Sequence, residues 1–193
     1  MMNLRSFFYL LLIAGVPFAG AETNTASTGA ITFNVDPGKS EVHFTLGAIL
    51  HTVHGTFKIE SGVVHLDPNT GKASGHITVD VRSGNTGEGT RDRQMHANVL
   101  ESERFPEATF TPDRVEGKVS LKGESNAMVH GVLRIHGQDH EMSVPVRVQA
   151  QGGSGIVRAK FTIPYVAWGM KDPSTFVLQV DKTVNVEVTL AGR

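Results

Sequence analysis

The chain has 193 residues, enough for one ordinary domain with a core that needs no covalent cross-links. It contains no cysteine, which excludes disulfides, thiolate metal sites and a cysteine nucleophile. Its formal net charge is −1 and no basic block stands out, so we expect no nucleic-acid partner.

The N-terminus has the pattern of a secretory signal peptide. Arg5 precedes an apolar run from Phe7 to Phe18, and the small residues Ala19-Gly20-Ala21 follow. The run is shorter than the roughly twenty residues that a membrane span needs. We therefore expect residues 1–21 to be cleaved, with no stable membrane anchor and a periplasmic or secreted location. Residues 22–30, rich in Thr, Ser, Ala and Gly, are predicted to be a flexible leader.

Apolar and polar residues alternate from residue 31 onward, which is typical of strands with one buried face. The clearest runs lie at residues 41–46, 57–60, 77–81, 142–149 and 184–190. Turn sequences rich in Gly, Pro, Asp and Asn separate them. The pattern predicts one all-β, antiparallel domain over residues 31–193, with about eight strands closed into a barrel. A sandwich is the alternative that the pattern leaves open.

Two segments interrupt this alternation. Residues 91–100 place Met95 and Val99 four positions apart, which predicts a short helix. Residues 47–54 lack a strand pattern, and this break favours a turn. In a helical turn, His51 and His54 would share a face.

Five motifs follow one another in a specific order. They are Phe33-Asn34-Val35-Asp36 with Ser40-Glu41-Val42-His43-Phe44, then Gly55-Thr56-Phe57, then Arg91-Asp92 through Phe105-Pro106-Glu107-Ala108-Thr109-Phe110, then Gly131 to Gly137, and Trp168-Gly169-Met170. In this order they resemble the YceI-like family of exported, lipocalin-like barrels that bind polyisoprenoids. Many members carry a His-Leu pair where this chain has Gly47-Ala48, so the chain resembles a divergent branch. The resemblance implies a lipocalin-like barrel, export and an apolar internal cavity.

The apolar strand faces supply the expected lining of that cavity. Its predicted ligand-binding residues are Val42, Phe44, Phe57, Ile77, Val79, Phe110, Leu133, Phe161 and Phe176. Trp168, beside Tyr165, could close one barrel mouth or stack on a ligand ring. A solid core would need the same residues, and it is the alternative interpretation.

Four polar side chains are candidates for a site at the barrel mouth. His51 and His54 form an H-x-x-H pair, and with His96 they could hold a polar head group or, as a weaker alternative, a metal ion. Arg91 follows a Gly-rich loop and could contact a phosphate group. Capping of the helix, with a salt bridge to a carboxylate, is the simpler role for Arg91.

The function that these features predict is binding rather than catalysis. We expect an exported protein that carries or sequesters an amphiphile with an apolar tail, such as a polyisoprenoid or a quinone. That ligand is the small-molecule partner, no other cofactor is expected, and a homodimer is left open. The alternatives are a metal-binding protein or metal-dependent enzyme that uses the histidines, and a structural stress protein with a filled core.

Overall fold

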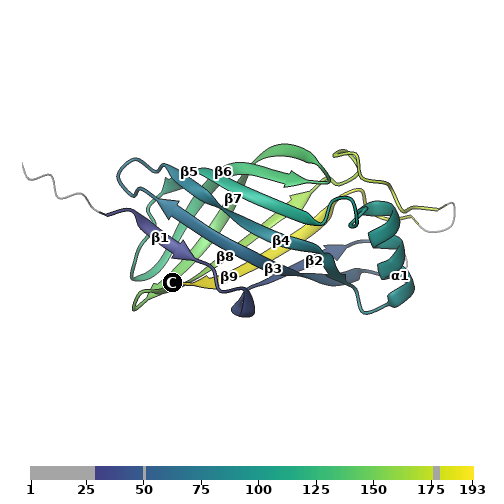
Figure 1. Ribbon diagram of the computed structural model, residues 1–193, viewed down its shortest axis with the longest axis horizontal. Helices are drawn as coiled ribbons and strands as arrows, with labels where there is room; N and C mark the ends of the chain where they lie inside the picture. Colours follow the sequence, from purple (N-terminus) through teal and green to yellow (C-terminus); the bar gives the residue numbers. More distant parts are fainter. Residues whose placement is uncertain (1–28, 50, 176–178) are drawn as a thin grey trace, which may run out of the picture.

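The structure is a computed structural model that describes residues 29–49, 51–175 and 179–193 (Figure 1). The predicted signal peptide, most of the leader and Phe176 therefore lie outside the described residues. Three helical segments are present in the described part: the 3-10 helix η1 (Pro37–Lys39), α1 (Gly89–Gln94) and the π-helix η2 (Met95–Val99). The strands are β1 (Ile31–Asn34), β2 (Glu41–Leu46), β3 (Val53–Leu66), β4 (Ala73–Asn85), β5 (Glu107–Gly117), β6 (Gly123–Ile135), β7 (Gln138–Gln151), β8 (Ser154–Ile163) and β9 (Val184–Gly192).

Eight of these strands close into an antiparallel barrel. Neighbours follow the order β3-β2-β9-β8-β7-β6-β5-β4, and a further pairing of β3 with β4 completes the ring. β1 is an extra strand that pairs with the far half of β3, from Ile31 opposite Leu66 to Asn34 opposite Val63. The prediction of an all-β lipocalin-like barrel of about eight strands is confirmed, and the sandwich is excluded.

The alternation in the sequence becomes the two faces of the barrel wall. On β9, Val186 and Leu190 point into the barrel and are 8% and 6% exposed. Glu187 points outward, where its carboxylate lies 2.7 Å from the Lys160 ammonium on β8. Apolar side chains are thereby removed from water on one face while charged groups stay hydrated on the other.

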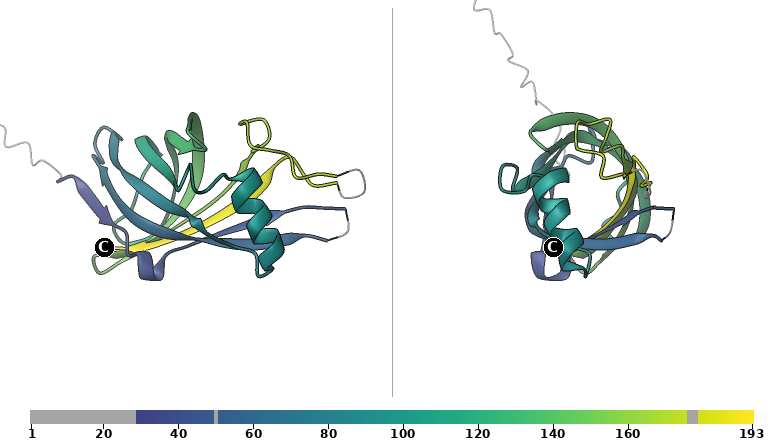
Figure 2. Two further views of the ribbon diagram at one scale, coloured as in Figure 1. Left: turned by 45° about the vertical axis from the view of Figure 1, so that its right-hand side comes forward. Right: turned by 90° about the vertical axis from the view of Figure 1, so that its right-hand side faces the viewer.

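The barrel has two different ends (Figures 1 and 2). At one end lie β1, the hairpins β3–β4, β5–β6 and β7–β8, and the last residues of β9; we call this the hairpin end. At the other end lie α1, η2 and residues 164–175 and 179–183, and we call this the helix end. No helix in the described residues has the length and apolar character needed to cross a membrane.

The short helix is confirmed, and its start is capped by an acidic side chain. The Glu88 carboxylate accepts hydrogen bonds from the backbone N–H groups of Thr90 and Arg91 at 2.9 and 2.7 Å. These two bonds hold the pKa of Glu88 below its usual value. The following turn widens into η2, where the Leu100 N–H donates to the Met95 carbonyl at 2.9 Å.

The break in the strand pattern predicted for residues 47–54 is confirmed for residues 47–49 and 51–52, which lie between β2 and β3, but a helical turn that includes His54 is wrong. His54 belongs to β3, opposite Thr45 of β2, and its Nδ1 lies 3.2 Å from the Thr45 hydroxyl. Residues 47–49 are extended because they pair with residues 179–181. The Ile49 N–H donates to the Gln179 carbonyl at 3.2 Å, and the Asp181 N–H donates to the Gly47 carbonyl at 2.9 Å. This long-range pairing is added to the reversal of the chain between the register partners Leu46 and Val53.

Candidate functional site

The barrel encloses an internal cavity of about 600 Å³ that extends from the helix end to the hairpin end. A volume between about 300 and 1,000 Å³ is usual for a small-molecule pocket. Eight of the predicted lining residues face this cavity: Val42, Phe44, Phe57, Ile77, Val79, Phe110, Leu133 and Phe161. Whether they contact a ligand stays a prediction.

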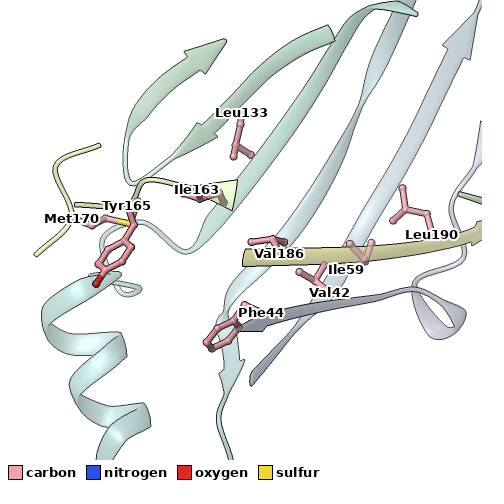
Figure 3. Close-up of a cluster of buried hydrophobic side chains, with 9 residues drawn as sticks. All are labelled: Val42, Phe44, Ile59, Leu133, Ile163, Tyr165, Met170, Val186 and Leu190. Carbon is pink, nitrogen blue, oxygen red and sulfur yellow. The ribbon is translucent and has the colours of Figure 1, made fainter. Parts of the chain in front are cut away.

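Buried side chains lie at the helix end of the cavity (Figure 3). Tyr165 and Met170, on the loop after β8, are 5% and 3% exposed. The Tyr165 hydroxyl donates to the Asp181 carbonyl at 2.8 Å, which ties two parts of this loop together. Met95 and Leu100 add apolar atoms to the cavity lining from the helical segment. A ligand that reaches this end therefore meets an apolar wall.

Three phenylalanine rings of the wall rest on glycines of the neighbouring strand. A Cβ atom built on Gly55 would lie 2.3 Å from the Phe44 ring, and one on Gly84 would lie 2.5 Å from the Phe57 ring. At Gly131 the corresponding distance to the Phe110 ring is 2.8 Å. Because these glycines carry no side chain, each ring occupies space next to the strand backbone.

Polar atoms reach the cavity mainly at the hairpin end. Of the described lining residues, Tyr165 has a polar group at the helix end, whereas Thr32, Ser120, Ser154 and Arg193 all belong to the hairpin end. Leu121, in the β5–β6 hairpin, also lines the cavity although 65% of the residue is exposed. A side chain that meets both the cavity and solvent marks an opening, so the mouth lies at the hairpin end.

Phe33 of β1 narrows this mouth. A Cβ atom on Gly192 would lie 2.8 Å from the Phe33 ring, and one on Gly155 would lie 3.5 Å from it. Gly155 and Gly192 are register partners on β8 and β9. The ring of the extra strand thus reaches the two strands on the other side of β2, where the paired glycines leave room for it.

Arg91 holds its own loop and does not line the cavity. Its Nε donates to the Thr86 hydroxyl at 2.8 Å and a second guanidinium nitrogen donates to the Thr86 carbonyl at 3.0 Å. The Thr86 N–H and hydroxyl both donate to the Asp92 carboxylate. Arg91 thus braces the loop before α1, and the Glu88 carboxylate accepts from its backbone N–H at the helix start; the salt bridge proposed with the simpler alternative is not among the ion pairs of the described residues.

The structure does not bring His51, His54 and His96 together as a metal site. No group of three or more His, Asp or Glu side chains suited to a metal ion occurs in the described ranges. His51 and His54 are exposed. His96 instead links two backbone segments, with Nδ1 3.0 Å from the Ser102 hydroxyl and Nε2 2.9 Å from the Gly84 carbonyl.

Trp168 lies at the helix end and packs against the same apolar cluster, but it is not among the residues that line the cavity. Its ring stacks on His140 with centroids 3.9 Å apart and planes 8° from parallel. Of the two roles offered for Trp168, closing one end of the barrel therefore fits its position, whereas stacking on a ligand ring would need the indole to reach the cavity.

Sequence reasoning missed many lining residues that its own patterns contained. Met142, Val144, Val146 and Val148 alternate on β7 and all face the cavity. Period-two alternation alone would have placed them there. The mouth residues Ser120 and Leu121 carry no such signal, because they lie in the turn between β5 and β6.

Solved structures with the same fold come from several bacteria. BcnA of Burkholderia cenocepacia superposes with a TM-score of 0.67 at 21% identity, covering 82% of this chain and 99% of that one. A polyisoprenoid-binding domain of Saccharophagus degradans superposes with a TM-score of 0.65 at 18% identity, and the match covers 83% of this chain and 97% of that one. The YceI protein of Campylobacter jejuni superposes with a TM-score of 0.60 at 20% identity, and the match covers 73% of this chain and 85% of that one.

A search of curated proteins found no match. The sequence profile of the YceI-like domain, in contrast, matches residues 33–191, which is most of the chain and all eight strands of the barrel. With this match and the lipocalin-like barrel, the chain belongs to the YceI-like family.

Proposed function

We propose that this protein binds an amphiphile with a long apolar tail, a polyisoprenoid or a quinone, inside its barrel. The observation that carries the proposal is the cavity of about 600 Å³ with an almost wholly apolar lining. Each buried methylene of a tail contributes about 0.8 kcal/mol, so a tail binds tightly without directional contacts. The Saccharophagus degradans domain of the same fold is described as polyisoprenoid-binding, which supports this ligand class.

The ligand is oriented by the polarity of the two ends. The tail lies toward the buried residues Tyr165 and Met170, and the polar head lies at the hairpin end. There the Ser120 and Ser154 segments and Arg193 offer polar groups. A head group that remained hydrated at this mouth would avoid the cost of burying it without hydrogen bonds.

We further propose that the protein acts in an exported form, as a carrier or store and not as an enzyme. Support for export comes from the charge, apolar run and small residues of the first 21 positions. Family membership supports a binding role. The alternative of a structural protein with a filled core is disfavoured by the cavity itself, and no observation in the described residues favours the metal-dependent alternative.

Mass spectrometry of organic extracts tests this proposal. The protein is purified from its native host without detergent, and its extract is compared with that of an unrelated exported protein handled identically. We expect a stoichiometric isoprenoid or quinone in the first extract. An extract without any such lipid, from protein that also fails to take up added isoprenol, would overturn the proposal.

A further inference from the structure

The β5–β6 hairpin at the cavity mouth carries an exposed apolar side chain between two unpaired cations. Among the described residues, Leu121 and Ile49 are the large apolar side chains that stand out as exposed, at 65% and 71%. Lys118 and Lys122 flank Leu121, and neither forms an ion pair in the part of the chain that the structure describes.

The hairpin is braced in this shape by its own hydrogen bonds. The Ser120 hydroxyl donates to the Lys122 carbonyl at 2.6 Å and accepts from the Lys122 N–H at 3.2 Å. The Ser120 N–H donates to the Ser125 hydroxyl at 3.0 Å. Val119 packs against the small apolar cluster of Leu66, Ala73 and Val115. Leu121 is therefore held outward by a built turn and is not simply the end of a loose loop.

The charges around the hairpin favour an anionic partner. Its nearest acid on β5, Glu116, is engaged by the Arg114 guanidinium at 3.1 Å, and the pKa of Glu116 is lowered chiefly by its hydrogen bond with His130. Glu124 on β6 is the remaining acid close in sequence. Arg193 lines the cavity at the same end of the barrel. An exposed apolar side chain with a lysine on either side of it in the hairpin complements the surface of a bilayer with anionic head groups.

We propose that Lys118, Leu121 and Lys122 dock the cavity mouth onto an anionic lipid bilayer, so that a ligand passes between bilayer and barrel without crossing water. This inference rests on the proposed function, since the mouth matters only if the cavity holds a lipid. Leu121 inserts among the acyl chains next to the head groups, while the two ammonium groups contact lipid phosphates. The same Leu121 side chain lines the cavity, so the docked surface is continuous with the site.

Vesicle flotation measures the docking directly. The purified protein is mixed with vesicles of phosphatidylcholine alone or of equimolar phosphatidylcholine and phosphatidylglycerol. We expect binding to the second kind, with added salt weakening it. Leu121→Ser and the double variant Lys118→Glu/Lys122→Glu should each weaken binding on the order of tenfold. The matched controls at the helix end, Ile49→Ser and Lys171→Glu, should bind like the parent.

A transfer assay separates docking from ligand binding. A fluorescent isoprenol is offered either in the anionic vesicles or in detergent micelles. Lys118→Glu/Lys122→Glu, whose two positions do not line the cavity, should take it up normally from micelles and slowly from vesicles, whereas Phe110→Trp, which narrows the cavity, should float normally and take up little from either. Equal flotation of the parent, Leu121→Ser and Ile49→Ser, or binding to the anionic vesicles that survives Lys118→Glu/Lys122→Glu, overturns docking. Failure of the parent to take up isoprenol from micelles counts against the proposed function instead.

Discussion

His96 engages both ring nitrogens inside the protein, which explains why a histidine next to a helix was a poor guide to a metal site. One nitrogen meets the Gly84 carbonyl of β4 and the other meets the Ser102 hydroxyl, whose residue is only 3% exposed. The imidazole thus connects the end of β4 to the loop after η2 by a hydrogen bond to each. Sequence spacing could not reveal this, because the two partners lie 12 residues before and 6 residues after the histidine.

Replacing His96 by alanine should therefore destabilise the fold. The change leaves the Ser102 hydroxyl and the Gly84 carbonyl without their partner, which costs about 1–3 kcal/mol. The exposed pair His51→Ala and His54→Ala should change the free energy of unfolding by less than about 0.5 kcal/mol. Urea denaturation of the parent, of His96→Ala and of the double variant His51→Ala/His54→Ala measures the three free energies of unfolding. A double variant as unstable as His96→Ala would contradict this role of His96. Zinc and copper assays on protein purified without a His tag test the metal alternative.

Phe110 distinguishes a ligand cavity from a filled core. In a filled core, Phe110→Trp would cost about 1–3 kcal/mol of stability. In this barrel the ring faces the cavity, so we expect a loss below about 1 kcal/mol and a marked loss of isoprenol uptake. The same is expected of Phe44→Trp and Phe57→Trp.

Ala73→Leu provides the control for these tryptophan variants. Ala73 is 5% exposed, belongs to the small cluster with Leu66 and Val115, and does not line the cavity. Overpacking there should reduce stability without a direct effect on uptake. Chemical denaturation and fluorescence titration measure the two quantities separately. A tryptophan variant that unfolds as readily as Ala73→Leu while still binding ligand would refute the cavity interpretation.

At the scale of elements, the strands and the short helix were predictable because their signals are local. Alternation marks β2, β4, β7 and β9, and the spacing of Met95 and Val99 marks the helical segment. The extended course of residues 47–49 and the position of β1 were not predictable, since both depend on pairing with residues far along the chain. The mouth at the hairpin end was missed for the same reason.

The pKa of the Tyr165 phenol reports on the loop at the helix end of the barrel. Burial raises the pKa of Tyr165 to about 12, and the carboxylates of Asp172 and Asp181 add to the shift. The phenol of the unfolded chain titrates near its ordinary value of about 10. Because the folded pKa is the higher one, the stabilisation from this group is complete below pH 10 and is lost as the pH rises toward 12.

Spectrophotometric titration of the phenol checks this expectation. The chain has two tyrosines, and the other, Tyr9, lies in the predicted signal peptide, so the cleaved protein reports on Tyr165 alone. We expect a midpoint well above that of the protein in concentrated urea. Tyr165→Phe should abolish the signal and lose the hydrogen bond to the Asp181 carbonyl, at a cost of about 1 kcal/mol. Coincident midpoints in the native and denatured states would show that the loop does not bury the phenol.

At the scale of the whole molecule, closure of the sheet separates a barrel from a sandwich. Alternating strands are common to both folds, and the decision lies in two pairings, β2 with β9 and β3 with β4. The first joins segments more than 130 residues apart in sequence, from Glu41 to Thr189. The ordered motifs of the family resolved what periodicity alone left open.

Export remains the prediction that concerns the whole chain. Expression in the native host should give a protein whose N-terminal sequence starts at or near Glu22, because signal peptidases cut after small residues such as Ala19-Gly20-Ala21. Edman sequencing or intact-mass analysis of extracellular or periplasmic protein provides the measurement, with whole-cell lysate as the comparison. An intact Met1 on the accumulated protein would be inconsistent with cleavage.

The glycines behind the phenylalanine rings influence the width of the cavity. Gly55, Gly84 and Gly131 let three rings lie back against the wall, so the free width depends on residues that never touch the lumen. A methyl group at Gly84 would meet only side chains, the Phe57 ring first and then Met95 and His96, and would push the ring inward. At Gly55 and Gly131 it would also meet the backbone carbonyls of Asn85 and Thr111, so the strands themselves would have to shift. The girth of the tail that this barrel admits can therefore change through a substitution at Gly84, while every lining side chain stays the same.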